Sequence, residues 1–259
     1  MIRYKLIIEY DGENFIGWQK QKKGFSVQET IEKAAQKFLQ EDITLIVAGR
    51  TDSGVHAEAQ VAHLDISKKL KIKNILLGLN FYITKEKFGQ DISIKKVILV
   101  NNEFNARFSA KKKFYNYKIY NKEYRSPINT KNTWWVAQKL NIDDMKKASS
   151  FLIGKHDFSS FRAVGCQASS PIKTIEEIII KKKKNIITIT FIARSFLYKQ
   201  VRIMTGTLKD VGTGLIKPQS LKKIIKDKSR KSAGITAPSK GLTLATLIGL
   251  LIRSLIKSP

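Results

Sequence analysis

The segment AGRTDSGVHAE (48–58) brings together the residue types that nucleophilic and acid–base chemistry require. It follows the apolar run ITLIVA (43–48) and contains Arg50, Asp52 and His56. An aspartate beside a desolvated arginine keeps a low pKa and stays ionised at neutral pH, as a nucleophile must. The same pair could instead brace a turn, so the segment alone leaves a nucleophilic site and a structural ion pair as alternatives.

Two other interpretations of this segment lack partners that their chemistry needs. HAE (56–58) resembles the H-x-E signature of zinc nucleobase deaminases, but these enzymes also need a downstream P-C-x-x-C. The chain has a single cysteine, Cys166, which excludes that metal shell and any internal disulfide. GRTDSG also lacks the G-K-[ST] ending of a P-loop, and Asp52 would repel a bound phosphate.

Two hydrolytic interpretations are weakly supported by the pattern. Asp52, Ser53 and His56 have the residue types of a catalytic triad, but a catalytic serine needs a sharp elbow and a base that usually comes from elsewhere in the chain. A glycosidase needs two carboxylates a few ångströms apart across a sugar. Glu58 or Asp65 would supply the second carboxylate only if folding happened to bring it close.

The charge of the chain indicates an anionic partner. Its 259 residues include 48 Lys+Arg against 21 Asp+Glu, a net charge of +27. A field of that size attracts polyanions and speeds their association, so RNA, DNA and anionic membrane are candidate partners. A genome-wide compositional bias could also enrich lysine. The N-terminus has no signal-peptide pattern, and the apolar run 242–252 is shorter than a membrane span, so we expect a soluble cytoplasmic protein.

Hydrophobic periodicity predicts the elements that must position these residues. Strands are expected over 3–10, 43–48, 59–66, 91–100, 113–121, 172–180, 185–193 and 241–251. Helices are expected over 27–40, 74–83, 141–154, 198–212 and 221–227. Ser26 and Glu29 fit a capping box, and Gly154 is expected to close the third helix. The hairpins predict an α+β fold of two similar halves, 1–103 and 104–259, each a largely antiparallel sheet with flanking helices.

Six further segments accompany GRTDSGVHA in a fixed order along the chain. They are YDGENFIGWQKQ (10–21), SVQETIE (26–32), FNARFSAKKKFYNYKIY (104–120), GKHDFSSFRAVGCQASSP (154–171), FLYKQVRIMTGTLKDVGTG (196–214) and TAPSKGLTLATL (236–247). Together with 48–65, these blocks resemble the TruA family of tRNA pseudouridine synthases over essentially the whole chain. Seven collinear blocks make this resemblance far more specific than a single motif.

The resemblance implies an isomerase that converts uridine to pseudouridine at positions 38, 39 and 40, in the anticodon stem and loop of tRNA. It also implies an active-site cleft between the two halves, a homodimer that holds tRNA in two basic clefts, and chemistry without a metal or an organic cofactor. Asp52 matches the family's nucleophile, and Arg50 matches the arginine that helps to extrude the target base. Tyr115 matches the tyrosine that stacks on that base, and Arg202 matches the arginine that pairs with the aspartate.

Two loops match the family's tRNA-contacting segments. The first comprises Phe104, Asn105, Ala106, Arg107 and Phe108, and the second comprises Gly165, Cys166, Gln167, Ala168 and Ser169. His56 lies in the matched motif, but we expect it to be a structural histidine that holds the loop, and we expect Trp18 to lie in the core or in the wall of the cleft.

The chain departs from the family pattern in four places. ITKEKFGQDI (83–92) is longer than the usual L-P-x-D-[IV], K-F-Y replaces R-x-Y, Y-K-Q-V-R replaces H-H-M-V-R, and G-L-T-L lacks the usual tyrosine. A non-catalytic basic RNA-binding module, or a synthase that acts on another RNA, is the rival interpretation. Mapping of pseudouridine on tRNA separates these alternatives.

Overall fold

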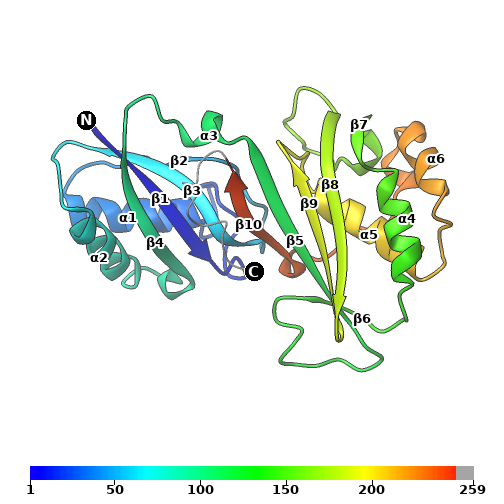
Figure 1. Ribbon diagram of the computed structural model, residues 1–259. Helices are drawn as coiled ribbons and strands as arrows, with labels where there is room; N and C mark the ends of the chain where they lie inside the picture. The colour runs from blue at the N-terminus through cyan, green and yellow to red at the C-terminus, as the bar shows by residue number, and fades with distance from the viewer. Residues whose placement is uncertain (249–259) are drawn as a thin grey trace. The chain divides into compact units, whose positions relative to one another are not determined.

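A computed structural model describes residues 1–248, and the chain forms two compact units (Figure 1). The first unit contains residues 1–111 and the segment that starts at Leu244, and the second contains residues 112–243. Both units combine antiparallel strands with packed helices, which confirms the predicted α+β class. Within residues 1–248, no helix is long and apolar enough to cross a membrane.

The sheet of the first unit places β1 between two antiparallel neighbours. Its strands are β1 (Ile2–Tyr10), β2 (Ile46–Val47), β3 (His56–Ile66) and β4 (Ile92–Val100), in the order β4-β1-β3 with β2 paired to β3. Its helices are α1 (Val27–Leu39), α2 (Ile72–Ile83) and the single turn α3 (Ala106–Ser109), with a 3-10 turn η1 (Gly89–Asp91). Helix α2 packs on both α1 and β4.

The start of α1 follows from its sequence. The Ser26 side chain accepts a hydrogen bond from the Glu29 backbone N–H at 3.2 Å, as the first half of the predicted capping box requires. The Glu29 carboxylate forms an ion pair with Lys33 at 3.0 Å, one helical turn later. Val27 and Ile31 are fully buried, so the apolar face of the helix covers the core.

The sheet of the second unit runs in the order β5-β9-β8-β7, and β6 pairs with β5 in parallel. These strands are β5 (Lys112–Asn121), β6 (Trp134–Val136), β7 (Gly154–Asp157), β8 (Ile172–Lys183) and β9 (Ile186–Ala193). Its helices are α4 (Ile142–Ser150), α5 (Gln200–Gly212) and α6 (Ser220–Asp227), with 3-10 turns η2 (Ser159–Phe161), η3 (Arg230–Ser232) and η4 (Ser239–Gly241). Alternate residues of β5, among them Tyr115, Tyr117 and Ile119, are buried, as expected for a half-covered strand.

The final described strand is β10 (Leu242–Ile248). It begins close to the predicted start at residue 241. The predicted continuation to residue 251 lies outside the described residues.

Three predicted boundaries are wrong for local reasons. The strand expected over 43–48 is reduced to Ile46–Val47, because the Leu45 backbone N–H donates to the Glu32 carboxylate of α1 at 2.8 Å rather than to a ladder. The helix expected to end at Gly154 ends at Ser150, and Gly154, with a φ of 104°, begins β7 instead. The strand expected to end at residue 180 continues to Lys183, and Lys184, at a φ of 53°, lies in the turn that joins β8 to β9.

Candidate active site

The loop that carries Asp52 connects β2 to β3. The Val55 N–H donates to the Asp52 carbonyl at 3.2 Å, which closes a turn around Gly54, whose φ is 71°. The Asp52 side chain is half-buried and the Arg50 side chain is exposed. A carboxylate in this position is shielded on one side and still accessible to a reactant.

The block YDGENFIGWQKQ supports this loop through backbone contacts. Gly17 forms an isolated antiparallel bridge with Asp52, and the Trp18 N–H donates to the Thr51 carbonyl at 3.1 Å. Gly17 has a φ of 114°, and a Cβ there would lie 2.6 Å from the Thr51 carbonyl oxygen. Only glycine fits this position, because a side chain would displace the backbone that holds Asp52.

A second close approach lies at the other end of the loop. A Cβ on Gly12 would lie 2.1 Å from the Val55 carbonyl oxygen, so the chain just after β1 meets the loop without room for a side chain. The Gly54 N–H donates to the Phe15 carbonyl at 3.2 Å. One segment, residues 12–18, about 40 residues earlier in the chain, therefore fixes the turn around Asp52 from both sides.

A polar network lies beneath the loop. The Tyr10 hydroxyl and the Thr51 Oγ1 are 2.7 Å apart, and the Gln60 side-chain amide donates to the Gly49 carbonyl at 2.7 Å. Burial raises the pKa of Tyr10 to about 12, against smaller opposing effects of its hydrogen bonds to Thr51 and Gln60. The hydroxyl is therefore protonated at neutral pH and is able to donate.

His56 begins β3 and is buried. Its Nδ1 accepts a hydrogen bond from the Gly12 N–H at 3.0 Å and lies 3.0 Å from the Asp11 carboxylate. These contacts tie the end of the loop to the residues that follow β1, as predicted for a structural histidine. Trp18 is 1% exposed and belongs to the core.

The loop that departs in length from the family pattern reinforces the same region. Phe88 contacts Phe15 and Phe25, with ring centroids 6.3 and 5.3 Å apart. The Asp11 N–H donates to the Asp91 carbonyl at 2.9 Å. Residues 83–92 thus brace the segment on which the Asp52 loop rests.

Tyr115 and Arg202 belong to the second unit. Tyr115 lies in β5, is 8% exposed and contacts the Phe196 ring edge-on at a centroid distance of 5.4 Å. Arg202 lies in the first turn of α5, and its Nε donates to the Ala237 carbonyl at 2.7 Å. The Ala237 N–H donates back to the Arg202 carbonyl at 3.1 Å, so the guanidinium is anchored to the segment 236–240.

Tyr117 strengthens the same anchor. Its hydroxyl donates to the Pro238 carbonyl at 2.8 Å. Burial raises the pKa of Tyr117 well above its ordinary value, although the nearby Arg202 opposes the shift. Two residues of the matched blocks therefore hold the chain immediately before β10.

The loop 165–169 is held by one arginine that the sequence did not single out. Arg162 donates from Nη2 to the carbonyls of Cys166 and Ala168, at 2.8 and 2.9 Å. The Tyr198 N–H donates to the Cys166 Sγ at 3.4 Å. Burial raises the pKa of the Cys166 thiol, but hydrogen bonds from Tyr198, Ala168 and Arg162 outweigh burial and lower it overall. Arg162 lies within the matched block 154–171, which is the signal that could have identified it.

The loop 104–108 includes the first three residues of the single-turn helix α3 (Ala106–Ser109). Phe104 and Asn105 are half-buried and Ala106 is fully buried, whereas Arg107 and Phe108 are exposed. The Arg107 guanidinium lies 5.6 Å from the centre of the Phe108 ring. A cation over an aromatic ring at the surface is suited to contact a nucleobase and a phosphate.

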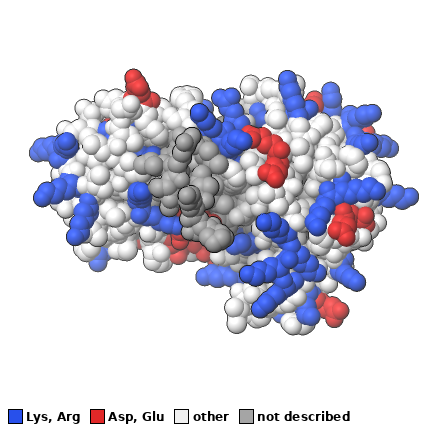
Figure 2. All heavy atoms as spheres, viewed as in Figure 1, with Lys and Arg blue, Asp and Glu red and all other residues white. Residues whose placement is uncertain are grey.

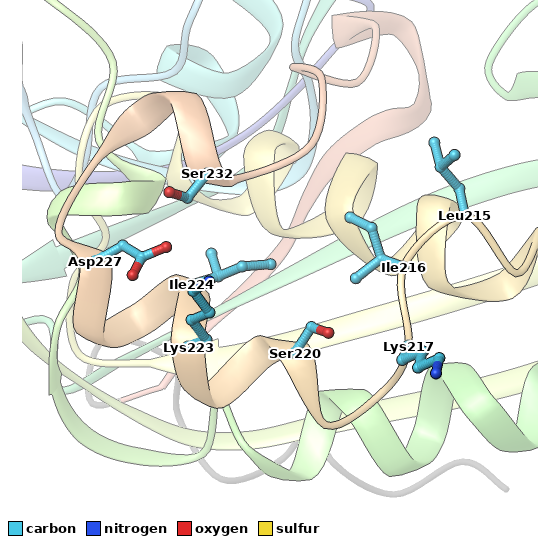
Figure 3. A pocket seen from close by; sticks show the side chains of 8 residues that line it. All are labelled: Leu215, Ile216, Lys217, Ser220, Lys223, Ile224, Asp227 and Ser232. Carbon is cyan, nitrogen blue, oxygen red and sulfur yellow. The ribbon is translucent and has the colours of Figure 1, made fainter.

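Two further features are the distribution of charged side chains and a cavity in the second unit. On the face shown in Figure 2, lysine and arginine side chains outnumber acidic ones over both units. A cavity of about 390 Å³ in the second unit is lined by Leu215, Ile216, Lys217, Ser220, Lys223 and Asp227, among others (Figure 3). None of the predicted site residues lines it. In residues 1–248, no group of three or more His, Cys, Asp or Glu side chains is placed to hold a metal ion.

Comparisons with known proteins match these segments. A family model described as tRNA pseudouridine synthase matches residues 6–108 and 148–247. A tRNA pseudouridine synthase A of Anaplasma phagocytophilum (strain HZ) is 46% identical over 245 residues, which cover 94% of this chain and 98% of that protein. A tRNA pseudouridine synthase A of Brucella ovis is 41% identical over 244 residues, which cover 94% of this chain and 96% of that protein.

The ranges matched by the family model include Asp52 and Arg202. Tyr115 lies between the two ranges.

Proposed function

The chain belongs to the family of tRNA pseudouridine synthases, which are isomerases, and from this premise we propose that it acts on the anticodon stem-loop of tRNA with Asp52 as its nucleophile. Its targets are the uridines at positions 38, 39 and 40, as the resemblance of the seven blocks implies. The observation that carries the proposal is the backbone support of Asp52 by Gly12 and Gly17, which fixes one half-buried carboxylate at an accessible turn.

The reaction is a rearrangement in which the atoms of the substrate are conserved. The bond between C1′ and N1 breaks, the uracil rotates, a bond forms between C1′ and C5, and C5 then loses its proton while N1 gains one. The Asp52 carboxylate can add to the base, attack C1′, or remove the C2′ proton so that a glycal forms. Each route needs an ionised carboxylate held against the flipped nucleotide.

Three further residues act around that carboxylate. The target base must leave the helical stack, which costs a few kcal/mol. Arg50, exposed two residues before Asp52, helps to extrude the base, and Tyr115 stacks on it and assists the loss of the C5 proton. Arg202, anchored through Ala237, pairs with the Asp52 carboxylate as the matched motif implies.

The basic surface supplies most of the affinity for tRNA. A net charge of +27 favours phosphate contacts that release counterions, and the loops 104–108 and 165–169 add local contacts. The enzyme acts as a homodimer in the cytoplasm, where its substrate is found, and needs neither a metal nor an organic cofactor.

The test is to incubate the protein with unmodified tRNA and to map pseudouridine by chemical derivatisation. Asp52→Asn removes the nucleophile without changing the size of the side chain, so it is expected to abolish product and leave tRNA binding largely intact. Glu58→Gln is the matched control, because it removes a neighbouring exposed carboxylate and is expected to retain full turnover. A wild-type protein that binds tRNA and forms no pseudouridine would instead indicate the non-catalytic RNA-binding module.

A further inference from the structure

The helix α3 is too short to stabilise itself. Four residues form only one turn, and a first helical turn is unfavourable without external support. Its N–H groups also lack the partners that a longer helix supplies to all but its first turn. The side-chain oxygen of Asn105 accepts hydrogen bonds from the backbone N–H groups of Arg107 and Phe108 at 3.0 and 3.4 Å. The backbone carbonyl of Asn105 accepts one from the Ser109 N–H at 2.8 Å.

The first N–H group of α3 has a different kind of partner. The Ala106 N–H donates to Nδ1 of His63 at 3.2 Å, and His63 lies in β3, 43 residues earlier in the chain. Ala106 is fully buried and His63 is 2% exposed, so water cannot replace this bond. The His63 ring also meets the Phe104 ring edge-on, with centroids 5.9 Å apart. An imidazole nitrogen accepts a hydrogen bond only when it carries no proton, so this arrangement requires the neutral side chain.

A second contact fixes the same loop from its other side. Nη1 of Arg3 donates to the carbonyls of Asn102 and Phe104, at 2.7 and 2.8 Å. The rest of the Arg3 guanidinium forms two hydrogen bonds of 2.7 Å with the Asp65 carboxylate. Arg3 on β1 and His63 on β3 therefore both hydrogen-bond to the backbone just before α3 or at its start.

The charged groups around His63 come from its own strand, β3, and from the neighbouring strand β1. Lys5, its register partner on β1, and Arg3 are cationic, while Asp65 on β3 is anionic. Burial lowers the pKa of His63 below its ordinary value, Arg3 lowers it further, and Asp65 opposes the shift.

Lys5 belongs to the same cluster, and its Nζ lies 5.4 Å from the centre of the Phe104 ring. Its own pKa is lowered by burial and by Lys96 on β4. On β2 the register partner of His63 is the apolar Ile46, and on α3 the one charged side chain is the exposed Arg107.

We propose that His63 is a positioning residue for tRNA binding, whose neutral imidazole fixes the start of α3 and thereby orients the exposed pair Arg107 and Phe108 toward the RNA. This inference rests on the proposed function, because the contact of 104–108 with tRNA is part of it. Protonation of His63 removes the acceptor and leaves the Ala106 N–H buried without a partner. Affinity for tRNA therefore falls as the pH drops below about 6.5, the ordinary pKa of histidine, because burial lowers the pKa of His63.

The predicted direction is opposite to that of nonspecific electrostatics. An additional proton makes a basic protein more positive and strengthens its attraction for phosphate. A decrease of affinity in acid therefore reports the loss of a local acceptor rather than a change of the overall field.

The test compares two variants that differ in the acceptor. His63→Asn places an amide oxygen where Nδ1 lies and does not titrate, so its KM and Kd for tRNA are expected to match the wild type at neutral pH. Between about pH 7.5 and 5.5 these values are expected to stay flat in the variant and to rise in the wild type. His63→Leu removes the acceptor, so its KM is expected to stay at every pH about five- to tenfold above the value that the wild type has at neutral pH, with kcat unchanged.

Three results would overturn the proposal. They are an Asn variant that titrates like the wild type, a Leu variant that binds tRNA normally, and a loss confined to kcat. If His63→Leu does not fold, the comparison of wild type with His63→Asn still decides the question.

A readout without turnover separates this inference from the proposed function. The ¹⁵N shift of His63 Nδ1 and the hydrogen exchange of the Ala106 amide are expected to change together in acid, and direct tRNA binding is expected to weaken over the same range. A wild-type protein that forms no pseudouridine but shows these coupled changes would refute the proposed function alone. Coupled changes in the protein without any change in tRNA affinity would refute the positioning role.

Discussion

The Asp52 loop and the loop 165–169 are supported in different ways. Asp52 is held through backbone contacts, and the close approaches at Gly12 and Gly17 leave no room for a side chain. In the loop 165–169, a Cβ on Gly165 would meet no described atom within 4 Å, and Arg162 is the side chain that ties its carbonyls. A reacting carboxylate must be held within a fraction of an ångström, whereas a loop that contacts RNA gains from adapting to it.

Alanine at Gly17 and at Gly165 tests this difference most strongly. Both glycines have a positive φ, 114° and 81°, so both substitutions strain the backbone. Only Gly17→Ala also drives a Cβ to 2.6 Å from the Thr51 carbonyl oxygen. We expect Gly17→Ala to lower kcat about a hundredfold, because displacement of a reacting group by about an ångström has an effect of that size.

Gly165→Ala is expected to leave kcat within severalfold of the wild type, because the substitution introduces backbone strain of about 1 kcal/mol and no steric clash. Single-turnover rates of pseudouridine formation on both variants provide the measurement. Equal losses in the two variants would show that the Asp52 loop is no more tightly constrained than the loop 165–169.

Arg162 offers a smaller perturbation of the second loop. Arg162→Ala releases the carbonyls of Cys166 and Ala168 and is expected to raise KM for tRNA about three- to tenfold without a change in kcat, since one charged donor is lost. Arg162→Lys keeps the charge, but its side chain is one bond shorter than the path to the Nη2 that makes both hydrogen bonds, so it is expected to behave like the alanine variant. Recovery of the wild-type KM in the lysine variant would mean that charge, and not the geometry of the loop, is what Arg162 supplies.

The same contrast explains which parts of the molecule the sequence could predict. Strong periodicity over many residues predicted α1, β1 and α5 to within a few residues, because their buried faces repeat regularly. The four-residue strand β7 and the single turn α3 were not predicted, because they depend on tertiary partners rather than on a repeat of their own.

The candidate site divides in a similar way. Motif positions were sufficient to propose Asp52 and its companions, and the family membership inferred from the motifs is confirmed. The supports at Gly12, Arg162 and His63 join segments that are far apart or lie inside loops, and no local pattern reports such contacts. Single-sequence reasoning therefore identifies the residues that carry the chemistry more readily than the residues that hold them in place.

Tyr10 separates support of the Asp52 loop from general stability. Tyr10→Phe deletes the hydroxyl that bonds Thr51, and it is expected to lower the free energy of unfolding by about 1 kcal/mol and kcat severalfold. Tyr4→Phe is the matched control, because that hydroxyl on the same strand exchanges two hydrogen bonds with Leu70, away from the loop. We expect the control to lose similar stability and no activity, as measured by urea unfolding and turnover. A loss of kcat in the control of the same size would assign the Tyr10 effect to the fold as a whole.

Cys166 gives the smallest expected effect and probes how adaptable the second loop is. Its Sγ accepts a hydrogen bond from the Tyr198 N–H, and a serine Oγ can accept in its place, so Cys166→Ser is expected to change KM by less than about twofold. The lowered pKa of the thiol predicts that iodoacetamide alkylates the wild type faster near neutral pH than an ordinary thiol. The added group must displace the Tyr198 contact, so alkylated wild type should bind tRNA more weakly while treated Cys166→Ser remains unchanged. Alkylation that leaves tRNA affinity unaltered would place this part of the loop away from the RNA. The flexibility of the loop 165–169 would then have no role in tRNA binding.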